Sequence, residues 1–195
     1  MDLNINEKFE IFTKRLRLSI INEDDLLPIT EIVNNINISK QLDDAPHPYT
    51  ITHAKELYDK MIHDLHNKNP SFYFTIHFNE GNSCAIGAIC LIPVEGKEEE
   101  RSIGYYLNEQ FWRKGIMYEA AKEIVKFAFQ KLHSKRLFID PFSDNFASIG
   151  LAKKLGFREI DPPNYKSKSM ATNIMHDNCR LEMNLEEYLT LNSKF

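Results

Sequence analysis

The sequence predicts a mixed α/β protein, built on a mostly antiparallel sheet with helices on both faces. Three short apolar segments joined by turns lie in the middle of the chain, as in an antiparallel meander. Two helical patterns precede this meander, and two more alternate with strand patterns after it. The 195 residues suit one domain, and we expect a single domain over residues 1–195.

The first third of the chain predicts one strand and two helices. Residues 13–20 alternate polar and apolar side chains, as a half-buried strand does. The polar cluster at 22–25 is typical of a helix N-cap and favours a short helix over 26–35. Thr52 is a candidate cap for a second helix over 53–66, whose apolar residues recur on one face.

The rest of the chain alternates strands and helices. We expect strands at 72–78, 84–92 and 102–107, a long helix at 116–132, a strand at 136–140, a short helix at 148–155, and strands at 157–160 and 179–185. Gly156 suits the left-handed position after the short helix. The polar segment 161–178 reads as a loop, and a loop of that length in a compact domain is more often functional than idle.

Composition indicates an ordinary soluble globular protein, with 43% hydrophobic and 27% charged residues. The net charge of −4 argues against nucleic acid as the main partner, because such domains are usually basic. No apolar run approaches the length needed to cross a bilayer, and residues 1–10 lack the apolar core of a signal peptide. We therefore expect a cytoplasmic protein that binds neither nucleic acid nor membrane.

The cysteine content also agrees with a reducing compartment such as the cytoplasm. The three cysteines, Cys84, Cys90 and Cys179, are odd in number, and no pair has metal-ligand spacing. A disulfide framework or a cysteine-based metal site is therefore not expected, and the histidines are scattered without metal spacing. We predict no metal.

The segment 110–121 has the features of an anion site at a helix N-terminus. The first turn of a helix has backbone N–H groups without internal partners and carries the positive end of the helix dipole. Arg113 and Lys114 add charge, and Gly115 lets the backbone approach a ligand such as a pyrophosphate closely. A basic helix start after an ordinary loop has the same features, so this segment alone does not decide. The fingerprints of the nucleotide P-loop and the dinucleotide fold are absent.

Two longer motifs carry a resemblance to a family. The segment Ile103-Gly-Tyr-Tyr-Leu107, followed by Phe111-Trp-Arg-Lys-Gly-Ile-Met-Tyr-Glu-Ala-Ala121, resembles the acetyl-CoA-binding motif of the GNAT superfamily of N-acetyltransferases. About thirty residues later, Asp144-Asn-Phe-Ala-Ser148 and Leu155-Gly-Phe157 resemble that family's second signature.

The ends of the chain resemble one branch of that family. Residues 13–18 resemble the first strand of the fold. Residues 48–54 and 181–188 resemble a segment and a closing strand of the RimJ/RimL-like branch, the ribosomal-protein N-terminal acetyltransferases. The resemblance covers nearly the whole chain, in order and at suitable spacing.

The resemblance implies a splayed sheet that holds acetyl-CoA, the acetyl-donor cosubstrate, between the strand ending near Leu107 and the strand around Phe138. The pantetheine amides would pair with backbone exposed at the splay, as a peptide adds to a sheet edge. Arg113 stands where glycine is frequent in the family, and Met117 where glycine or alanine is frequent. The implied cofactor-binding residues are Tyr105, Leu107, Arg113, Lys114, Gly115, Ile116, Met117, Tyr118 and Asn145.

The resemblance also implies a general acid. Many members use a tyrosine four residues before the glycine of the Leu-Gly-Phe signature, and this chain has Ala152 there. Ser148 is therefore the candidate catalytic residue that protonates the departing CoA thiolate. Asn145 and Ser148 would also both serve as ordinary helix caps.

The general base is not identified by the sequence. The branch often has glutamate at two positions that are Ser102 and Ile160 in this chain. Glu119, in the first turn of the long helix, is explained by the helix dipole, which leaves a catalytic role as the lesser alternative. An α-amine has a reference pKa near 8 and needs less help to lose its proton than a lysine side chain.

The implied activity is acetyl transfer to a primary amine by direct attack in a ternary complex, with an N-terminal α-amine of a protein or peptide preferred. A small amine such as a polyamine, an amino acid or an antibiotic is the alternative, as is a weakly active acetyl-CoA sensor. Residues 41–49 and 161–178 are the expected walls of the acceptor site, where Asp43 and Asp44 could attract a cation or be simply solvated. We expect a monomer or a homodimer.

Overall fold

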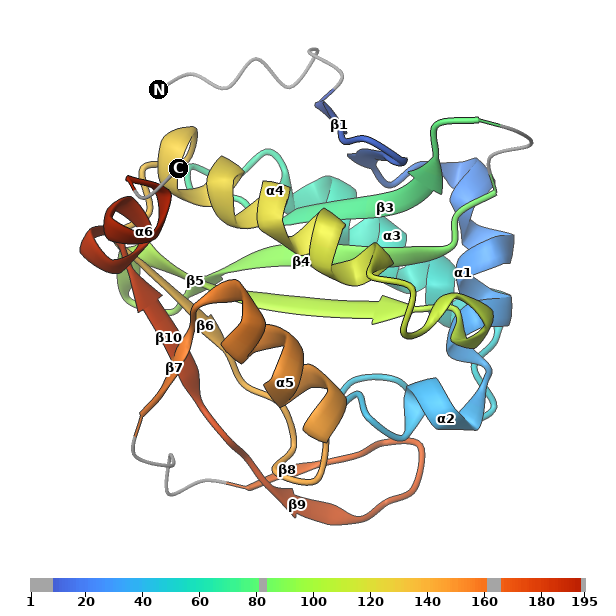
Figure 1. The fold of residues 1–195 in the computed structure, drawn as a ribbon. Helices are drawn as coiled ribbons and strands as arrows, with labels where there is room; N and C mark the ends of the chain where they lie inside the picture. Colours follow the sequence, from blue (N-terminus) through green and yellow to red (C-terminus); the bar gives the residue numbers. More distant parts are fainter. Residues whose placement is uncertain (1–8, 81–83, 161–165, 194–195) are drawn as a thin grey trace.

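A mixed sheet forms the centre of the protein in a computed structural model, which describes residues 9–80, 84–160 and 166–193 (Figure 1). In these residues the sheet has the order β1-β2-β3-β4-β5-β6-β10-β7, and every neighbouring pair is antiparallel except β5 and β6. The strands are β1 (Glu10–Phe12), β2 (Leu16–Ile20), β3 (Phe72–Phe78), β4 (Gly87–Val94), β5 (Lys97–Leu107), β6 (Arg136–Ile139), β7 (Arg158–Glu159) and β10 (Leu181–Asn184). The expected mostly antiparallel mixed sheet is confirmed.

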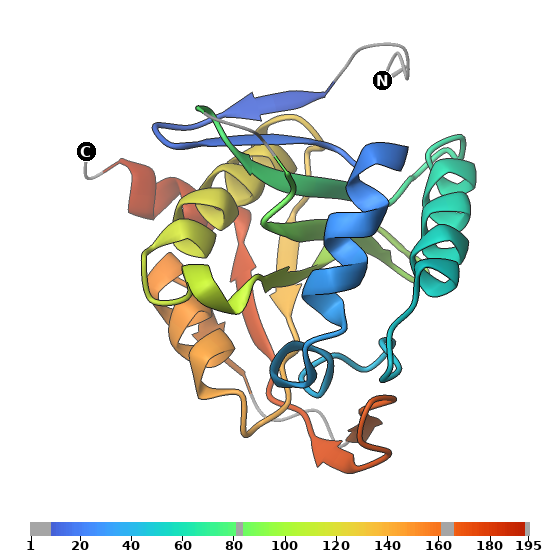
Figure 2. The ribbon, with the colours of Figure 1, turned by 90° about the vertical axis from the view of Figure 1, so that its right-hand side faces the viewer.

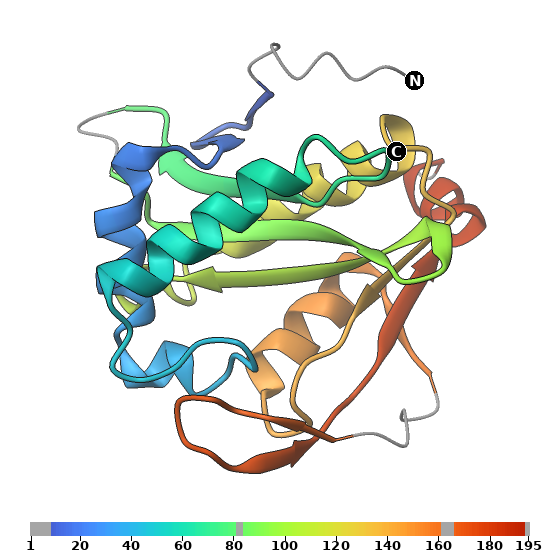
Figure 3. The ribbon, with the colours of Figure 1, turned by 180° about the vertical axis from the view of Figure 1, so that it is seen from behind.

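Helices cover both faces of the sheet, as predicted (Figure 2). On one face lie α4 (Ile116–Gln130) and α5 (Phe146–Leu155). On the other face lie α1 (Leu26–Val33) and α3 (Ile51–Asp64), which Figure 3 shows from behind. The short α2 (Ile36–Ser39) lies between them in the chain. A last helix, α6 (Leu185–Asn192), follows β10 directly.

Each face of the sheet has its own apolar core. Under α4, completely buried residues of the strands, such as Leu18 and Phe74, pack with Ile124 of the helix. Under α1 and α3, a smaller cluster joins Ile29, Val33 and Met61. The period-two pattern of the strands thus supplies both cores, and removing this area from water is the main force that stabilises the layers.

The parallel pair β5 and β6 opens into a wedge. The two strands are paired only where Glu100–Ser102 faces Arg136–Phe138. Beyond Ser102, β5 stays paired with β4 as far as Leu107, whereas β6 ends at Ile139 and the chain turns toward α5. The two strands therefore diverge, and backbone groups of β5 on this side have no partner strand (Figure 1).

Several predicted boundaries are wrong, and three of them have a clear physical reason. Helix α3 begins two residues earlier than expected, because Thr50 rather than Thr52 forms the cap, in a reciprocal arrangement with His53. Strand β5 begins at Lys97, so that the charged run 97–101 is strand and not turn. Its first residues are exposed at the end of a hairpin, where charged side chains reach water without cost.

The third boundary lies at the end of the chain. The strand expected over 179–185 ends at Asn184, whose side chain accepts a hydrogen bond from the Glu187 amide and caps α6. The Glu187 carboxylate accepts a hydrogen bond from the Asn184 amide, which completes a capping box. The segment expected as a loop also contains a small hairpin, β8 (Lys166–Lys168) with β9 (Met175–Asp177), and residues 161–165 lie outside the described residues.

Candidate functional site

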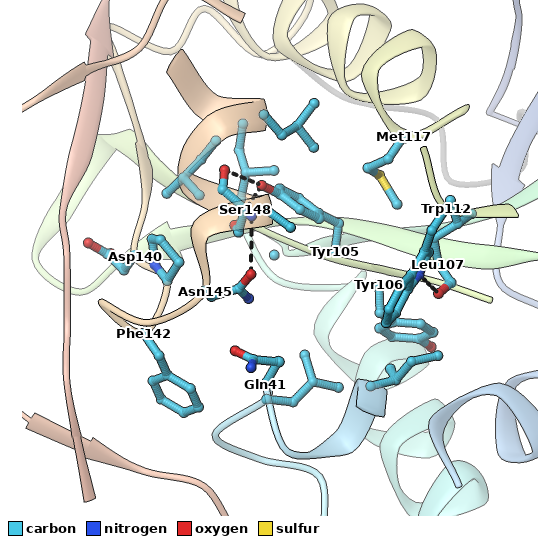
Figure 4. Close-up of a pocket in the computed structure, with 18 of the residues that line it drawn as sticks. Gln41, Tyr105, Tyr106, Leu107, Trp112, Met117, Asp140, Phe142, Asn145 and Ser148 are labelled. Atoms are coloured by element: carbon cyan, nitrogen blue, oxygen red, sulfur yellow. Dashed lines mark hydrogen bonds between the residues drawn. The ribbon is translucent and has the colours of Figure 1, made fainter. Parts of the chain in front are cut away.

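A cavity of about 1010 Å³ lies where β5 and β6 diverge. Its walls come from the end of β5, the turn before α4, the start of α5 and the chain after α2 (Figure 4). Eight of the nine predicted cofactor-binding residues line it, together with Ser148. These are Tyr105, Leu107, Arg113, Gly115, Ile116, Met117, Tyr118 and Asn145. Residues from four separate parts of the chain therefore meet in one space.

The N-terminus of α4 faces this cavity with amides that have no partner within the helix. Gly115 is the N-cap, with a left-handed φ of 71°, and no side chain caps the helix there. The amides of the next three residues, Ile116 to Tyr118, precede the first intrahelical hydrogen bond, which Glu119 donates to Gly115. The dipole of α4 adds a partial positive charge, so this end of the cavity is suited to a phosphate group.

Arg113 and Lys114, the two basic residues of the turn, differ in position. Arg113 lines the cavity and has a left-handed φ of 59°, which explains why glycine is frequent at this place in the resembling family. The Lys114 ammonium lies 5.6 Å from the centre of the Phe111 ring, and Lys114 is not among the described lining residues. A cofactor contact by the Lys114 side chain therefore stays a prediction.

Trp112 ties this turn to the end of β5. Its indole N–H donates to the backbone oxygen of Leu107 over 2.7 Å (Figure 4). The ring itself is partly exposed at the cavity wall. The contact fixes the distance between the splayed strand and the α4 N-terminus.

Glu119 is occupied by structural contacts. One carboxylate oxygen accepts hydrogen bonds from the Thr13 hydroxyl at 2.5 Å and the Arg15 amide at 2.9 Å. The other accepts from the Arg15 guanidinium at 2.7 Å. Burial raises the pKa of Glu119, but these hydrogen bonds outweigh it and leave the pKa lowered. This carboxylate joins the β1–β2 turn to α4, which agrees with a structural rather than a basic role.

At the other end of the cavity, α5 presents Ser148. The side chain of Asn145 caps the helix by accepting from the Ser148 amide at 3.1 Å, so the capping alternative holds for Asn145. The Ser148 hydroxyl lies 2.8 Å from the hydroxyl of Tyr105, which comes from β5 (Figure 4). Burial raises the pKa of Tyr105 to about 12, against a smaller lowering by the bond to Ser148. Ala152 is fully buried and offers no proton donor.

Carboxylates are scarce around Ser148. Ser102 lines the cavity, whereas Ile160 is not among the described lining residues. Asp43 and Asp140 are the carboxylates of the described lining. Both oxygens of Asp140 accept from the Arg180 guanidinium, at 2.6 and 3.0 Å, which leaves Asp140 engaged in an ion pair.

The two expected acceptor walls reach the same cavity. Gln41 and Asp43 line it from the chain after α2, and Ser167 and Asn178 line it from the segment 161–178. The side-chain oxygen of Gln41 is buried without a hydrogen-bond partner in the described part of the chain, and Figure 4 shows the amide facing the region of Asn145. Such an oxygen is free to accept from a ligand N–H.

Sequence reasoning missed Tyr106 and the residues of α2 as lining. Strand alternation explains the omission of Tyr106, since consecutive residues face opposite sides and the resemblance assigns Tyr105 and Leu107 to the site. The four-residue α2, which contributes Asn37 and Ile38, has too short a pattern to predict.

Within residues 9–80, 84–160 and 166–193, no group of three or more His, Cys, Asp or Glu side chains could hold a metal ion. In the same residues, none of the helices combines the length and apolar character needed to span a membrane.

Comparison with known proteins identifies the fold and the family. Residues 15–158 match the acetyltransferase (GNAT) domain. YnaD, an uncharacterized N-acetyltransferase of Bacillus subtilis (strain 168), is 26% identical over 148 residues, which are 76% of this chain and 82% of YnaD.

Two solved structures have the same fold. One is the spermidine N-acetyltransferase from Vibrio cholerae in complex with CoA and spermine, with a TM-score of 0.75, 21% identity, and coverage of 91% of this chain and 99% of that one. The other is RimL, a ribosomal L7/L12 alpha-N-protein acetyltransferase in complex with coenzyme A, with a TM-score of 0.76, 18% identity, and coverage of 92% and 99%. The domain match covers most of the chain, and the sheet opens at the strands that the family resemblance implied. The chain therefore belongs to the GNAT family of acetyltransferases.

Proposed function

We propose that this acetyl-CoA-dependent N-acetyltransferase acts on the N-terminal α-amine of a protein or peptide, as a cytoplasmic enzyme of the RimJ/RimL-like branch with a single domain over residues 1–195. The observation that carries the proposal is one continuous cavity. It runs from the first amides of α4, past the Tyr105–Ser148 pair, to the polar wall that includes Gln41.

The cosubstrate fits this cavity from end to end. The pyrophosphate lies at the α4 N-terminus, where Gly115 and the amides that follow it favour negative charge. The pantetheine arm follows the open side of β5 and pairs with backbone groups between Ser102 and Leu107. The thioester then lies near Ser148 and Tyr105.

The reaction is a direct transfer. The neutral amine attacks the thioester carbonyl, the carbon–sulfur bond breaks, and Ser148 gives its proton to the departing thiolate. The nitrogen, which becomes positively charged on attack, releases one proton to water. No cysteine is among the described lining residues. Burial raises the pKa of Cys90 to about 12 and that of Cys179 to about 11, which keeps both thiols protonated and poorly nucleophilic.

Of the two carboxylates in the described lining, Asp140 is held by Arg180, and this shortage of bases favours an α-amine. A group with a reference pKa near 8 is partly neutral at physiological pH, whereas a lysine-like amine needs a base. The unpartnered oxygen of Gln41 supplies a hydrogen-bond acceptor for the N–H groups of such a substrate. The fold shared with RimL agrees with this choice of acceptor.

A second candidate is a small polyamine. Asp43 lines the cavity, and burial together with the charge of Asp43 raises the pKa of the neighbouring Asp44. Asp43 at the cavity wall, with Asp44 next to it in the chain, would attract a polycation. The fold shared with the spermidine N-acetyltransferase supports this second candidate.

An acceptor panel distinguishes the two. Thiol release from acetyl-CoA is measured with peptides that have free N-termini, the same peptides with blocked N-termini, and spermidine. We expect the free peptides to give the highest kcat/KM, the blocked peptides to be inactive and the enzyme mass to stay unchanged. Faster turnover of spermidine would replace the peptide proposal, and a kinetically competent acetyl-enzyme would overturn direct transfer.

A further inference from the structure

One hydrogen bond crosses the wedge between the splayed strands. It joins Tyr105, on the part of β5 beyond its last contact with β6, to Ser148 near the start of α5. The two hydroxyl oxygens are 2.8 Å apart, and the Tyr105 hydroxyl also donates to the Ser148 backbone oxygen at 3.4 Å. Both residues line the cavity (Figure 4).

The direction of this hydrogen bond decides what Ser148 can do. If Ser148 donated to Tyr105, its only proton would be held by the phenol and would not be available to a thiolate. A phenol is a far stronger acid than an aliphatic alcohol, so the favourable arrangement has Tyr105 donating to the Ser148 oxygen. The Ser148 proton then turns toward the cavity, where the thioester lies.

We infer that Tyr105 is a positioning residue for acetyl transfer, whose hydroxyl orients the Ser148 proton toward the leaving sulfur and replaces that proton as it departs. The inference rests on the proposed function, since it assigns Tyr105 a task beyond contact with the cosubstrate.

The proton movements balance. As the carbon–sulfur bond breaks, the sulfur takes the proton of the Ser148 hydroxyl, and the Ser148 oxygen takes the proton of the Tyr105 hydroxyl. The phenolate regains a proton from water, and the nitrogen of the new amide releases one to water. An alkoxide on Ser148 would be very costly in a largely buried site, and the transfer from Tyr105 avoids it.

Removing one hydroxyl tests this role. Tyr105→Phe keeps the ring and its packing but cannot donate, and Tyr58→Phe on α3, which is not among the described lining residues, is the matched control. Hydroxylamine serves as a small, largely neutral nucleophile, because its use does not depend on recognition of the natural acceptor. Enzyme-dependent thiol release is measured after subtraction of the uncatalysed rate, and acetyl-CoA affinity is measured by calorimetry.

We expect Tyr105→Phe to lower kcat at least about tenfold, in the range of lost general-acid assistance, with acetyl-CoA Kd within about twofold of wild type. Tyr58→Phe should retain wild-type kcat. Ser148→Ala should lower kcat more, and adding Tyr105→Phe to it should cost nothing further, because Tyr105 acts through Ser148.

Two results would overturn the inference: a Tyr105→Phe enzyme with wild-type kcat, or losses that multiply in the double variant. Failure of the peptide-acceptor proposal would give another result: the enzyme would acetylate hydroxylamine but not peptides with free N-termini. Absence of any enzyme-dependent thiol release by wild type would contradict the acetyl-transfer reaction and the Tyr105 role together.

Discussion

At the scale of single residues, the turn before α4 depends on backbone that few residues adopt. Arg113 and Gly115 both have positive φ, at 59° and 71°. For arginine this conformation costs of order 1 kcal/mol, whereas glycine adopts it freely. The positions of the two residues let the chain enter α4 with its first amides facing the cavity.

Gly115→Pro should therefore abolish acetyl-CoA binding, because proline fixes φ near −65° and cannot form this turn. Gly96, in the β4–β5 hairpin, has the same φ of 71° and is not among the described lining residues, so Gly96→Pro is the matched control. Both variants should unfold at lower temperature than wild type. Calorimetry should detect acetyl-CoA binding by Gly96→Pro and none by Gly115→Pro, and equal binding by both variants would disprove the assigned role of the turn.

Contacts between distant residues mark the limit of prediction from the sequence. The motifs placed Ser148 and Tyr105 in the site separately, but a pattern along the chain does not show that hydroxyls 43 positions apart meet. The same holds for the oxygen of Gln41, which is buried without a hydrogen-bond partner among the described residues. The Asn145 cap, in contrast, was predictable, because it depends on residues within one helical turn.

At the scale of elements, helix α4 is held in place by a contact at its first turn. Glu119 binds the hydroxyl of Thr13 and both the backbone and side chain of Arg15, and so anchors the β1–β2 turn to the helix. The anchored end of α4 is also the end that faces the cavity. We therefore expect stability and cosubstrate binding to be coupled at this end of α4.

Glu119→Gln should lower the free energy of unfolding by about 1 kcal/mol at neutral pH, since it removes a charge-assisted network. Because the folded protein lowers the pKa of Glu119 below 4.5, the stabilisation is complete above that value and is lost as pH falls through the folded-state pKa. Denaturant titrations at several pH values should show the two proteins converging in acid.

Glu123→Gln is the control, because the ion pair of Glu123 with the exposed Lys126 on the same helix is longer, at 3.5 Å. It should change the unfolding free energy by less than about 0.5 kcal/mol. A constant difference between wild type and Glu119→Gln at every pH would show that the ion pair is not the cause.

Prediction of the elements succeeded where a pattern was long. The apolar period of α4 and the alternation of β3 predicted both with errors of no more than two residues at either end. Helix α6 was missed because its apolar residues continue those of β10, although the Asn184 and Glu187 capping pair was present in the sequence. The hairpin of β8 and β9 has three residues in each strand, too few to show a period.

At the scale of the whole molecule, one departure from regular pairing makes the site. The sheet is continuous from β1 to β5 and from β6 to β7, but the two parts share only three paired positions at β5 and β6. Helices α4 and α5 lie on the same face and bring their N-terminal ends to the wedge (Figure 1). The family resemblance implied this wedge, since the strand ending near Leu107 lies in one shared segment and the strand around Phe138 lies between the two.

The expected acceptor end of the cavity is formed by segments that composition and hydrophobic periodicity predict poorly. Its wall is made by the chain after α2 and by the segment around β8 and β9. Neither has a motif, and their shape depends on packing across the molecule. Identity of the acceptor therefore has to be measured.

Calorimetric titration of the wild-type protein with acetyl-CoA, beside acetyl-pantetheine, tests the central claim most directly. Both ligands carry the thioester and the arm that follows β5, but only acetyl-CoA carries the pyrophosphate for the α4 N-terminus. Since hydrogen bonds to a charged group contribute about 1.5–3 kcal/mol each, acetyl-CoA should bind at least about tenfold more tightly. Equal affinity for the two ligands would contradict the assignment of the cavity as the acetyl-CoA site.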